Sequence, residues 1–245
     1  MPMSHEASGS LLHVRGVTRE FGGVRALDGV DLSVAPGEQL CIIGPNGCGK
    51  TTLFNVITAQ LPPTRGEVVF EGRALAGLAP HHIARLGIAR KFQVPSVFED
   101  LTVAENLEVA CFGLAASPQR PAAATLLEQI QLSDRADLLA GRLPHGARQW
   151  LEIGLLLAQA PRLLLLDEPT AGMTGAETLA TAALVRRLAQ DAGTAVVVVE
   201  HDMRFVQALD ARVVVMLAGR VVADGRFDEV RRLPQVRDAY LGAHA

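Results

Sequence analysis

The chain has 245 residues, of which 49% are hydrophobic and 20% charged, and its formal net charge is -3. A chain of this length and composition can bury a substantial core as one globular unit, which excludes an intrinsically disordered protein. The slightly acidic balance contains no basic block, so there is no electrostatic reason to expect nucleic acid as a partner.

No part of the sequence resembles a membrane span or an export signal. The best apolar runs, residues 163–166 and 196–199, are far shorter than the roughly 20 residues needed to cross a bilayer. Residues 1–10 are polar and lack the apolar core of a secretory signal. The three cysteines form no CxxC pair, which argues against a metal cluster or a disulfide framework. We therefore expect a cytoplasmic protein.

The beginning of the chain predicts an antiparallel β layer. Residues 11–17 are a strand-like run, and residues 27–34 alternate apolar and polar side chains before the Pro36-Gly37 turn. Phe21, the only aromatic residue in this region, could stack on an adenine base or pack within a core or hairpin.

The next stretch fits the phosphate-loop template GxxxxGK followed by Ser or Thr at every fixed position. An apolar strand over residues 39–43 precedes it, and a helix over residues 50–59 follows. This arrangement points backbone N–H groups and the positive end of the helix dipole into one concavity that suits phosphate oxygens. Lys50 is predicted to reach the β- and γ-phosphates, and the Thr51 hydroxyl to hold Mg²⁺. The predicted nucleotide-binding residues of this loop are Gly44, Pro45, Asn46, Gly47, Cys48, Gly49, Lys50, Thr51 and Thr52.

Cys48 lies inside this loop at a helix N-terminus. The helix dipole and nearby Lys50 favour a thiolate there, so we expect alkylation of Cys48 to block ATP binding and Mg-ATP to protect it. The alternative is that Cys48 is only a small filler residue.

After the phosphate-loop helix the sequence predicts a turn at 61–66, a strand at 67–70, a short helix at 81–86 and a strand at 88–92 that ends at Gln93. From residue 94 to about 142 the composition changes to Ala, Leu and charged residues without strand signals, which predicts a helical insertion. Thr102 and Glu105 form a capping box for its first helix, which we expect to continue through Val109. Pro121 is placed at the first turn of a second helix, and Ser133 caps a third.

The second half of the chain alternates helices and strands. Residues 143–147 precede a helical pattern at 148–159, and residues 163–166 form a central strand that ends in Asp167 and Glu168. A helix at about 176–190 and a strand at 195–199 follow, and the latter ends in Glu200-His201-Asp202. This alternation predicts an α/β fold with a mainly parallel sheet, in which ligands bind at the carboxyl ends of the strands.

The polar residues at these strand ends indicate chemistry. Asp167 follows four leucines and is costly to place there unless a cation meets it; Mg²⁺ on a bound triphosphate is the natural candidate. Glu168 could accept a proton from the attacking water, or orient that water. Either carboxylate alone could instead cap the next helix, and His201 alone could be an ordinary strand-end histidine. Together with Lys50 in the same sheet, they favour a γ-phosphate site.

These motifs, in this order, resemble those of the ATP-binding subunit of an ATP-binding-cassette (ABC) transporter from Phe21 to the end of the chain. The resemblance identifies Phe21 as the A-loop aromatic, Gln93 as the Q-loop residue, residues 143–147 as the signature and His201 as the switch histidine. It implies that Gln93 senses Mg²⁺ and the γ-phosphate, as both a catalytic and a metal-site residue. It also implies that Gln93 couples the binding of Mg²⁺ and the γ-phosphate to membrane-spanning partners through the helical insertion.

The resemblance further implies a P-loop NTPase core with an N-terminal antiparallel β layer and an α-helical subdomain at about 94–160, in one domain spanning 1–245. The implied cofactors are ATP and Mg²⁺, with hydrolysis to ADP and phosphate. The implied partners are two membrane permease subunits, a second ABC ATPase of the same or a related kind, and indirectly a periplasmic solute-binding protein. In a head-to-tail dimer, the signature residues His145 and Gly146 would complete the partner's nucleotide site. Such a subunit is peripheral, on the cytoplasmic face of the inner (cell) membrane.

Within the family, residues 83–93 are similar to importers of branched-chain amino acids, amides and urea. The finer strings at 90–93, 149–154, 171–174 and 199–206 resemble the urea-importer ATPase more than the amino-acid one. The sequence thus favours urea, with a branched-chain amino acid or amide importer as the alternative.

The chain departs from the family pattern at the signature, which normally reads LSGGQ, or LSHGQ in urea-type subunits, and at Thr174, where the D-loop is normally acidic. Pro144 offers a phosphate neither hydroxyl nor N–H, which predicts slow hydrolysis and leaves a catalytically weakened cassette open. Trp150, just downstream, is expected to report dimer closure by its fluorescence. Another alternative is a soluble ABC ATPase that remodels ribosomes, DNA or a repair complex. Such proteins typically carry two cassettes, a coiled-coil insertion or basic arms, and none is visible here.

Overall fold

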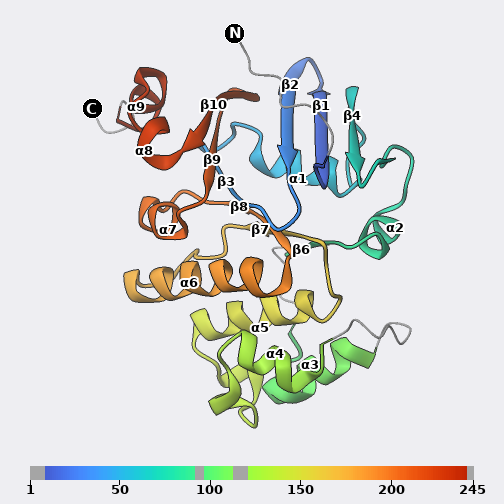
Figure 1. The fold of residues 1–245 in the computed structure, drawn as a ribbon, viewed down its shortest axis with the longest axis vertical. Helices are drawn as coiled ribbons and strands as arrows, with labels where there is room; N and C mark the ends of the chain where they lie inside the picture. The colour runs from blue at the N-terminus through green and yellow to red at the C-terminus, as the bar shows by residue number, and fades with distance from the viewer. Residues whose placement is uncertain (1–8, 92–96, 113–120, 242–245) are drawn as a thin grey trace.

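The computed structural model describes residues 9–91, 97–112 and 121–241, and it consists of two sheets above a helical lobe (Figure 1). Gln93 lies outside the described residues. Long helix α6 (Gly175–Ala192) runs between the larger sheet and the lobe (Figure 1).

The larger sheet is parallel except at one edge. In spatial order its strands are β10 (Arg220–Arg226), β9 (Arg212–Leu217), β3 (Gln39–Ile43), β8 (Ala195–Val199), β7 (Leu163–Asp167) and β6 (Ile88–Arg90). Only β10 pairs antiparallel, with β9. The predicted strand at 88–92 is described as far as residue 91, and β6 covers its first three residues.

This sheet is buried on both faces, because successive side chains of its strands enter two different cores. On β7, Leu163 and Leu165 belong to the core beneath the smaller sheet, whereas Leu164 and Leu166 belong to the core shared with the helices below. The prediction of a central strand from a continuous leucine run is therefore confirmed.

The smaller sheet is antiparallel and has the order β2 (Val24–Val34), β1 (Leu12–Phe21), β4 (Arg65–Phe70) and β5 (Arg73–Ala74). Its inward side chains, such as Leu12 and Val30, share one core with Phe54 and Ile57 of α1 (Lys50–Ile57). The predicted N-terminal β layer is thus confirmed, and it covers the helix that follows the phosphate loop.

The helical lobe contains α3 (Val103–Phe112), α4 (Ala123–Gln129), two 3₁₀ turns, η1 (Ser133–Arg135) and η2 (Ala140–Arg142), and α5 (His145–Leu157). Leu107, Ile130 and Leu151 are fully buried between these helices. Gly154 permits close packing, because a Cβ there would lie 2.8 Å from Cδ1 of Ile130. The remaining helices are α2 (Pro80–Arg85), α7 (Met203–Leu209), α8 (Phe227–Val230) and α9 (Pro234–Leu241).

Local sequence signals in the lobe were partly correct. The capping box is confirmed, since Thr102 N donates to Glu105 Oε2 at 2.7 Å and Glu105 N donates to Thr102 Oγ1 at 3.1 Å; its helix runs beyond Val109. The placement of Pro121 in a first turn was wrong. It precedes the extended N-cap Ala122, because the fixed φ of proline suits extended chain as well as helix. Ser133 caps no α-helix: it opens a 3₁₀ turn whose cap position Leu132 occupies.

Thr174 has a structural role as the N-cap of α6. Its side chain accepts a hydrogen bond from Glu177 N, and its own N–H donates to Glu177 Oε2 at 2.8 Å, which forms a complete capping box. The bonds from Thr174 hold the pKa of Glu177 below its ordinary value. The residue at the normally acidic position therefore fixes the start of the longest helix described.

We predict that Thr174→Ala destabilises the protein by about 1 kcal/mol, because the first turn of α6 loses its acceptor. For a chain of this size that loss lowers Tm by about 2–4 °C. Thermal unfolding monitored by circular dichroism measures the change. Thr174→Ser keeps the hydroxyl and should retain the wild-type Tm; equal Tm values for the Ala and Ser variants would contradict a capping role.

Candidate functional site

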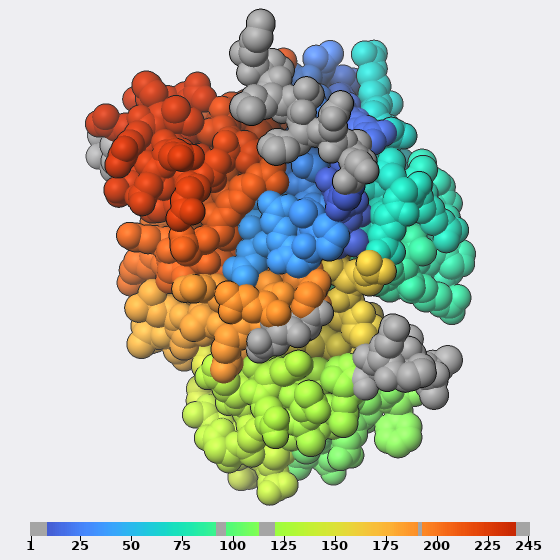
Figure 2. Space-filling model, viewed as in Figure 1, coloured from blue at the N-terminus to red at the C-terminus, as the bar shows by residue number. Residues whose placement is uncertain are grey.

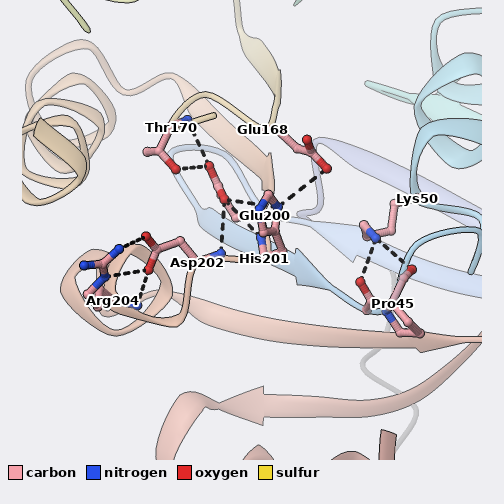
Figure 3. Close-up of polar contacts among 9 residues, drawn as sticks. Pro45, Lys50, Glu168, Thr170, Glu200, His201, Asp202 and Arg204 are labelled. Carbon is pink, nitrogen blue, oxygen red and sulfur yellow. Dashed lines mark hydrogen bonds and ion pairs between the residues drawn. The ribbon is translucent and has the colours of Figure 1, made fainter. Parts of the chain in front are cut away.

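The carboxyl ends of three neighbouring parallel strands form the site. The phosphate loop follows β3, Glu200 and His201 follow β8, Asp167 is the last residue of β7, and Glu168 follows it. Strand β8 lies between β3 and β7. Figure 3 shows Lys50, Glu168 and His201 gathered above this edge. The arrangement is the one expected when polar groups can leave a doubly buried sheet only at its ends.

The phosphate loop holds its lysine over its own backbone. Lys50 Nζ donates to the carbonyl oxygens of Gly44 at 2.7 Å and Pro45 at 3.0 Å, and the residue is 7% exposed. Gly49 has φ of 106°, and a Cβ there would lie 2.4 Å from the carbonyl oxygen of Ala26 on β2. The first N–H groups of α1 have no intrahelical acceptor, so this end of the helix suits an anion.

The structure supplies a protein cation for Asp167, which sequence reasoning missed. Arg90 Nη2, at the end of β6, lies 3.4 Å from Asp167 Oδ2, and the two side chains are 6% and 7% exposed. Arg90 Nη1 also donates to Asn55 Oδ1 of α1 at 2.6 Å. Burial lowers the pKa of Arg90, and the charge of Asp167 opposes that shift. A cation was expected to meet Asp167, and the structure shows Arg90 in that place; the assignment of Mg²⁺ to Asp167 stays a prediction.

Glu168 and His201 lie side by side although 33 residues separate them in sequence. Glu168 Oε1 is 3.6 Å from His201 Nδ1, and the two side chains are 42% and 59% exposed. Glu168 adopts φ of 47°, in the left-handed region, while its N–H donates to Val199 O of β8 at 2.9 Å. This conformation is uncommon in a non-glycine residue, and here it occurs where the chain leaves β7 at the site.

Phe21, the last residue of β1, is 43% exposed, which rules out its alternative role as a core residue. The guanidinium carbon of Arg19 lies 4.6 Å from the ring centroid of Phe21. The Phe21 ring thus lies at the end of a strand, faces solvent and contacts Arg19. A ring in this position is suited to stacking on a flat ligand.

The signature segment begins a helix earlier than predicted. Pro144, with φ −55° and ψ 154°, is the N-cap of α5, so His145, Gly146 and Ala147 already belong to the helix. His145 Nε2 lies 2.9 Å from the carbonyl oxygen of Ala171, which requires the proton on Nε2. His145 was expected to donate toward a partner's phosphate; here its ring is bonded to the segment that follows Glu168 in the same chain.

Trp150 connects the lobe to the core. Its Nε1 donates to Thr181 Oγ1 of α6 at 2.9 Å, and its ring packs against the core shared by the two helices. Fluorescence of Trp150 thus reports the packing of α5 on α6, in addition to any change at the signature face.

A groove separates the core from the lobe (Figure 2). Its volume is about 600 Å³, and α2, β6, α3 and α5 contribute its walls. Lys91 and Glu152 line it and form an ion pair of 3.1 Å, while Phe98 and Val109 expose apolar surface at 57% and 45%. Among the residues that the structure describes, no helix has the length and hydropathy of a membrane span.

The expectation of a reactive Cys48 was wrong. Burial raises the pKa of the Cys48 thiol, and the opposing effect of Lys50, whose Nζ lies 3.9 Å from Sγ, does not outweigh it. The residue is only 3% exposed. Desolvation dominates because Cys48 lies in the core beneath the smaller sheet and against Gly44 of its own loop: a Cβ on Gly44 would lie 2.6 Å from Sγ and 2.3 Å from Met216 O of β9. The filler alternative fits better.

Known proteins resemble this chain over nearly its whole length. The profile of the ABC transporter family matches residues 27–171. The high-affinity branched-chain amino acid transport ATP-binding protein BraF of Pseudomonas aeruginosa is 39% identical over 95% of this chain and 98% of that protein. LivG of Escherichia coli K12, described in the same words, is 37% identical with the same coverage. The methionine import ATP-binding protein MetN 1 of Rhodococcus jostii is 36% identical over 91% of this chain and 69% of that protein.

Solved structures of ATP-binding cassettes share the fold. A cassette of an ABC transporter in its ADP conformation has a TM-score of 0.84 and 32% identity, and it covers 96% of this chain and 100% of its own. A dimeric cassette in a post-hydrolysis state, bound to ADP and Pi, has a TM-score of 0.72 and 26% identity over 88% and 98% of the two chains. The predicted fold class is therefore confirmed.

We predict that Cys48 reacts with iodoacetamide more slowly than the half-buried Cys111 at pH 7, and that its rate still rises above pH ~9.5, where an ordinary thiol with a pKa of ~8.5 has levelled off. Peptide mass spectrometry after timed alkylation gives both rates, with Cys48→Ala as the control for peptide assignment. Rapid labelling of Cys48 at neutral pH would restore the thiolate hypothesis.

Proposed function

This chain belongs to the ABC transporter family, as an ATP-binding subunit of the branched-chain amino acid importer type, and we propose that it drives import of branched-chain amino acids through separate permease subunits. Membership of the family makes it an ATPase that binds ATP with Mg²⁺. The main support for the proposal is that the polar side chains expected to handle ATP lie at one sheet edge, in a chain similar to BraF and LivG. These residues are Lys50, Asp167, Glu168 and His201. The alternative specificity for urea rests only on short strings, and no relative reported above is named a urea transporter.

The residues at the sheet edge fit a Mg²⁺-nucleotide. We assign the phosphates to the loop from Gly44 to Thr52, with the Lys50 ammonium as the counter-charge that already lies over the loop. Thr51 and Asp167 would hold the Mg²⁺, which neutralises phosphate charge when bound. Two protein oxygens suffice, because Mg²⁺ keeps several waters and takes its other ligands from phosphates. Gln93 is assigned to the same ion by resemblance.

We assign the proton transfer to Glu168. Its carboxylate is partly exposed, so water can reach it, and no buried cation competes for it within the contacts of the described residues. As general base, Glu168 accepts a proton from the attacking water. His201, 3.6 Å from this carboxylate, is assigned to the γ-phosphate, so the pair would hold water and phosphate in one geometry.

The remaining assignments concern residues around the edge of the site and the partners of the chain. Phe21 is assigned to the adenine base and His145 with Gly146 to the phosphate of a second cassette in a head-to-tail dimer. The dimeric relative with ADP and Pi supports such a pairing. We propose one nucleotide-binding domain over 1–245, with residues 94–160 as its inserted helical subdomain. The groove between that subdomain and the core would face two permease subunits, which places the protein peripherally at the cytoplasmic membrane face; a periplasmic solute-binding protein would deliver the solute.

The proposal is tested by reconstituting the chain with its permease subunits and a second cassette in liposomes. We expect ATP hydrolysis to rise with the permeases, and uptake of labelled leucine, isoleucine or valine to require ATP. Labelled urea and methionine serve as competitors for specificity. ATP-dependent urea uptake without leucine uptake would reverse the solute assignment, and ATPase activity indifferent to the permeases would favour a soluble remodelling ATPase.

Glu168→Gln should nearly abolish hydrolysis while ATP affinity is retained, because the amide cannot accept the proton but preserves the shape of the site. An ATP-bound dimer should accumulate, which size-exclusion chromatography detects. Lys50→Ala is the matched comparison: it should weaken ATP binding itself, because the counter-charge at the loop is lost. Normal turnover in Glu168→Gln would refute the assignment of the base.

Pro144→Ser should raise the turnover of the dimer. Serine at an N-cap restores a hydroxyl and an N–H at the signature, and loss of one donor to developing charge typically costs roughly 10²–10³-fold in rate. Pro144 is exposed and extended, so the fold should tolerate serine. Adding Ala147→Gln, which the family signature suggests, is unsuitable, because Ala147 is 5% exposed and packs in the core. Equal turnover of wild type and Pro144→Ser would show that the hydroxyl is dispensable.

A further inference from the structure

Glu200, the residue that follows β8, has a fully buried carboxyl group. Its side chain is 0% exposed, and four donors converge on its two oxygens (Figure 3). Thr170 donates to Oε1 from its N–H at 3.0 Å and from its hydroxyl at 2.5 Å. The N–H groups of His201 and Asp202 donate to Oε2 at 3.0 and 3.4 Å.

These bonds join the two segments that carry the reacting side chains. Thr170 is two residues after Glu168, and His201 follows Glu200 directly. The N–H of Glu200 donates to Ile42 O of β3 at 3.2 Å, so the residue is also attached to the strand that precedes the phosphate loop. Glu200 therefore bridges the ends of β7 and β8, and its backbone extends the connection to β3.

Burying the Glu200 carboxyl group costs free energy, which indicates that the residue has a role beyond packing. A buried carboxyl group is expensive unless hydrogen bonds satisfy it, and an apolar residue of similar volume is often no less stable at a buried site. Here a carboxylate accepts at both oxygens from the turn after Glu168 on one side and from the switch segment on the other. Among the groups next to this bridge are the partly exposed side chains of Glu168 and His201, and His201 Nδ1 lies 4.0 Å from Glu200 Oε2.

We propose that Glu200 is a positioning residue for ATP hydrolysis: its carboxylate locks the turn at Thr170 to the backbone of His201 and so sets the distance between His201 Nδ1 and Glu168 Oε1. It touches neither the nucleotide nor the water and acts through His201. The inference rests on the proposed function, because it gives this role to the assigned base and switch histidine.

Glu200→Gln is the first test. The amide keeps the shape but replaces one acceptor by a donor, which must then face either the donors of Thr170 or the N–H groups of the switch segment. We expect kcat to fall by roughly 10²-fold, as for a small misplacement of reacting groups. KM for ATP and the affinity for a fluorescent ATP analogue should change by less than about twofold, because the loop from Gly44 to Thr52 makes no side-chain contact with Glu200 in the described contacts.

A matched pair of Thr170 variants tests the other end of the bridge, so the proposal can still be tested if Glu200→Gln does not fold. Thr170→Val removes the hydroxyl and keeps the shape, whereas Thr170→Ser keeps the hydroxyl; we expect a several-fold loss of kcat in the former and wild-type kcat in the latter. The double variant Glu200→Gln/His201→Ala should be no slower than His201→Ala alone, because the effect of Glu200 passes through His201.

Several outcomes would overturn the proposal. Wild-type kcat in Glu200→Gln would do so, as would equal kcat in the two Thr170 variants. Additive losses in the double variant, or parallel loss of ATP affinity and kcat with a lowered Tm, would reveal a purely structural role. An inactive wild-type protein would instead reject the proposed function and is distinguishable from all of these.

Discussion

Burial of both faces of the larger sheet is the constraint on which the site depends. Because side chains of β3, β7 and β8 alternate between two apolar cores, these strands cannot present polar groups along their length. Polar residues can emerge only where the strands end, and the parallel arrangement brings those ends to one edge. The loop after β3 and the acidic residues after β7 and β8 are close in space for this reason, although more than 100 residues separate them in sequence.

The sequence predicted the features that depend on local pattern. The phosphate loop, the capping box at Thr102, the leucine strand and the acidic residues behind it follow from spacing, composition and turn chemistry within a few residues. What it could not supply were contacts between elements that are distant in the sequence: Arg90 with Asp167, Glu200 with Thr170, and Trp150 with Thr181. Each pairs residues 30 or more positions apart, and nothing in the composition around either member indicates the other.

The same difference explains why the expectation for Cys48 failed. For Cys48, the charge of Lys50 and the helix N-terminus are visible in the sequence, but the enclosure by strands from elsewhere in the chain is not, and desolvation is the larger effect. His145 is a different case: its assignment to the phosphate of a second cassette stays a proposal, but nothing in the sequence indicated that its Nε2 lies 2.9 Å from the carbonyl oxygen of Ala171 in the same chain. Solute specificity is a separate case: the preference for urea rested on short strings, whereas BraF and LivG are described as branched-chain amino acid transport proteins.

Arg90 and Lys91 have a consequence for how this chain can diverge. They are adjacent and both basic, yet Arg90 forms a buried pair with Asp167 in the core, whereas Lys91 pairs with Glu152 of the lobe. The planar guanidinium reaches Asn55 and Asp167 together, and a compact ammonium cannot replace that fork. Exchanging the two side chains would leave composition and net charge unaltered, but a lysine at position 90 could not bind Asn55 and Asp167 together. Each of the two positions is therefore constrained separately. A sequence comparison that scores Arg and Lys as equivalent would treat replacement of Arg90 by lysine as neutral, although the buried contacts with Asn55 and Asp167 would not both form.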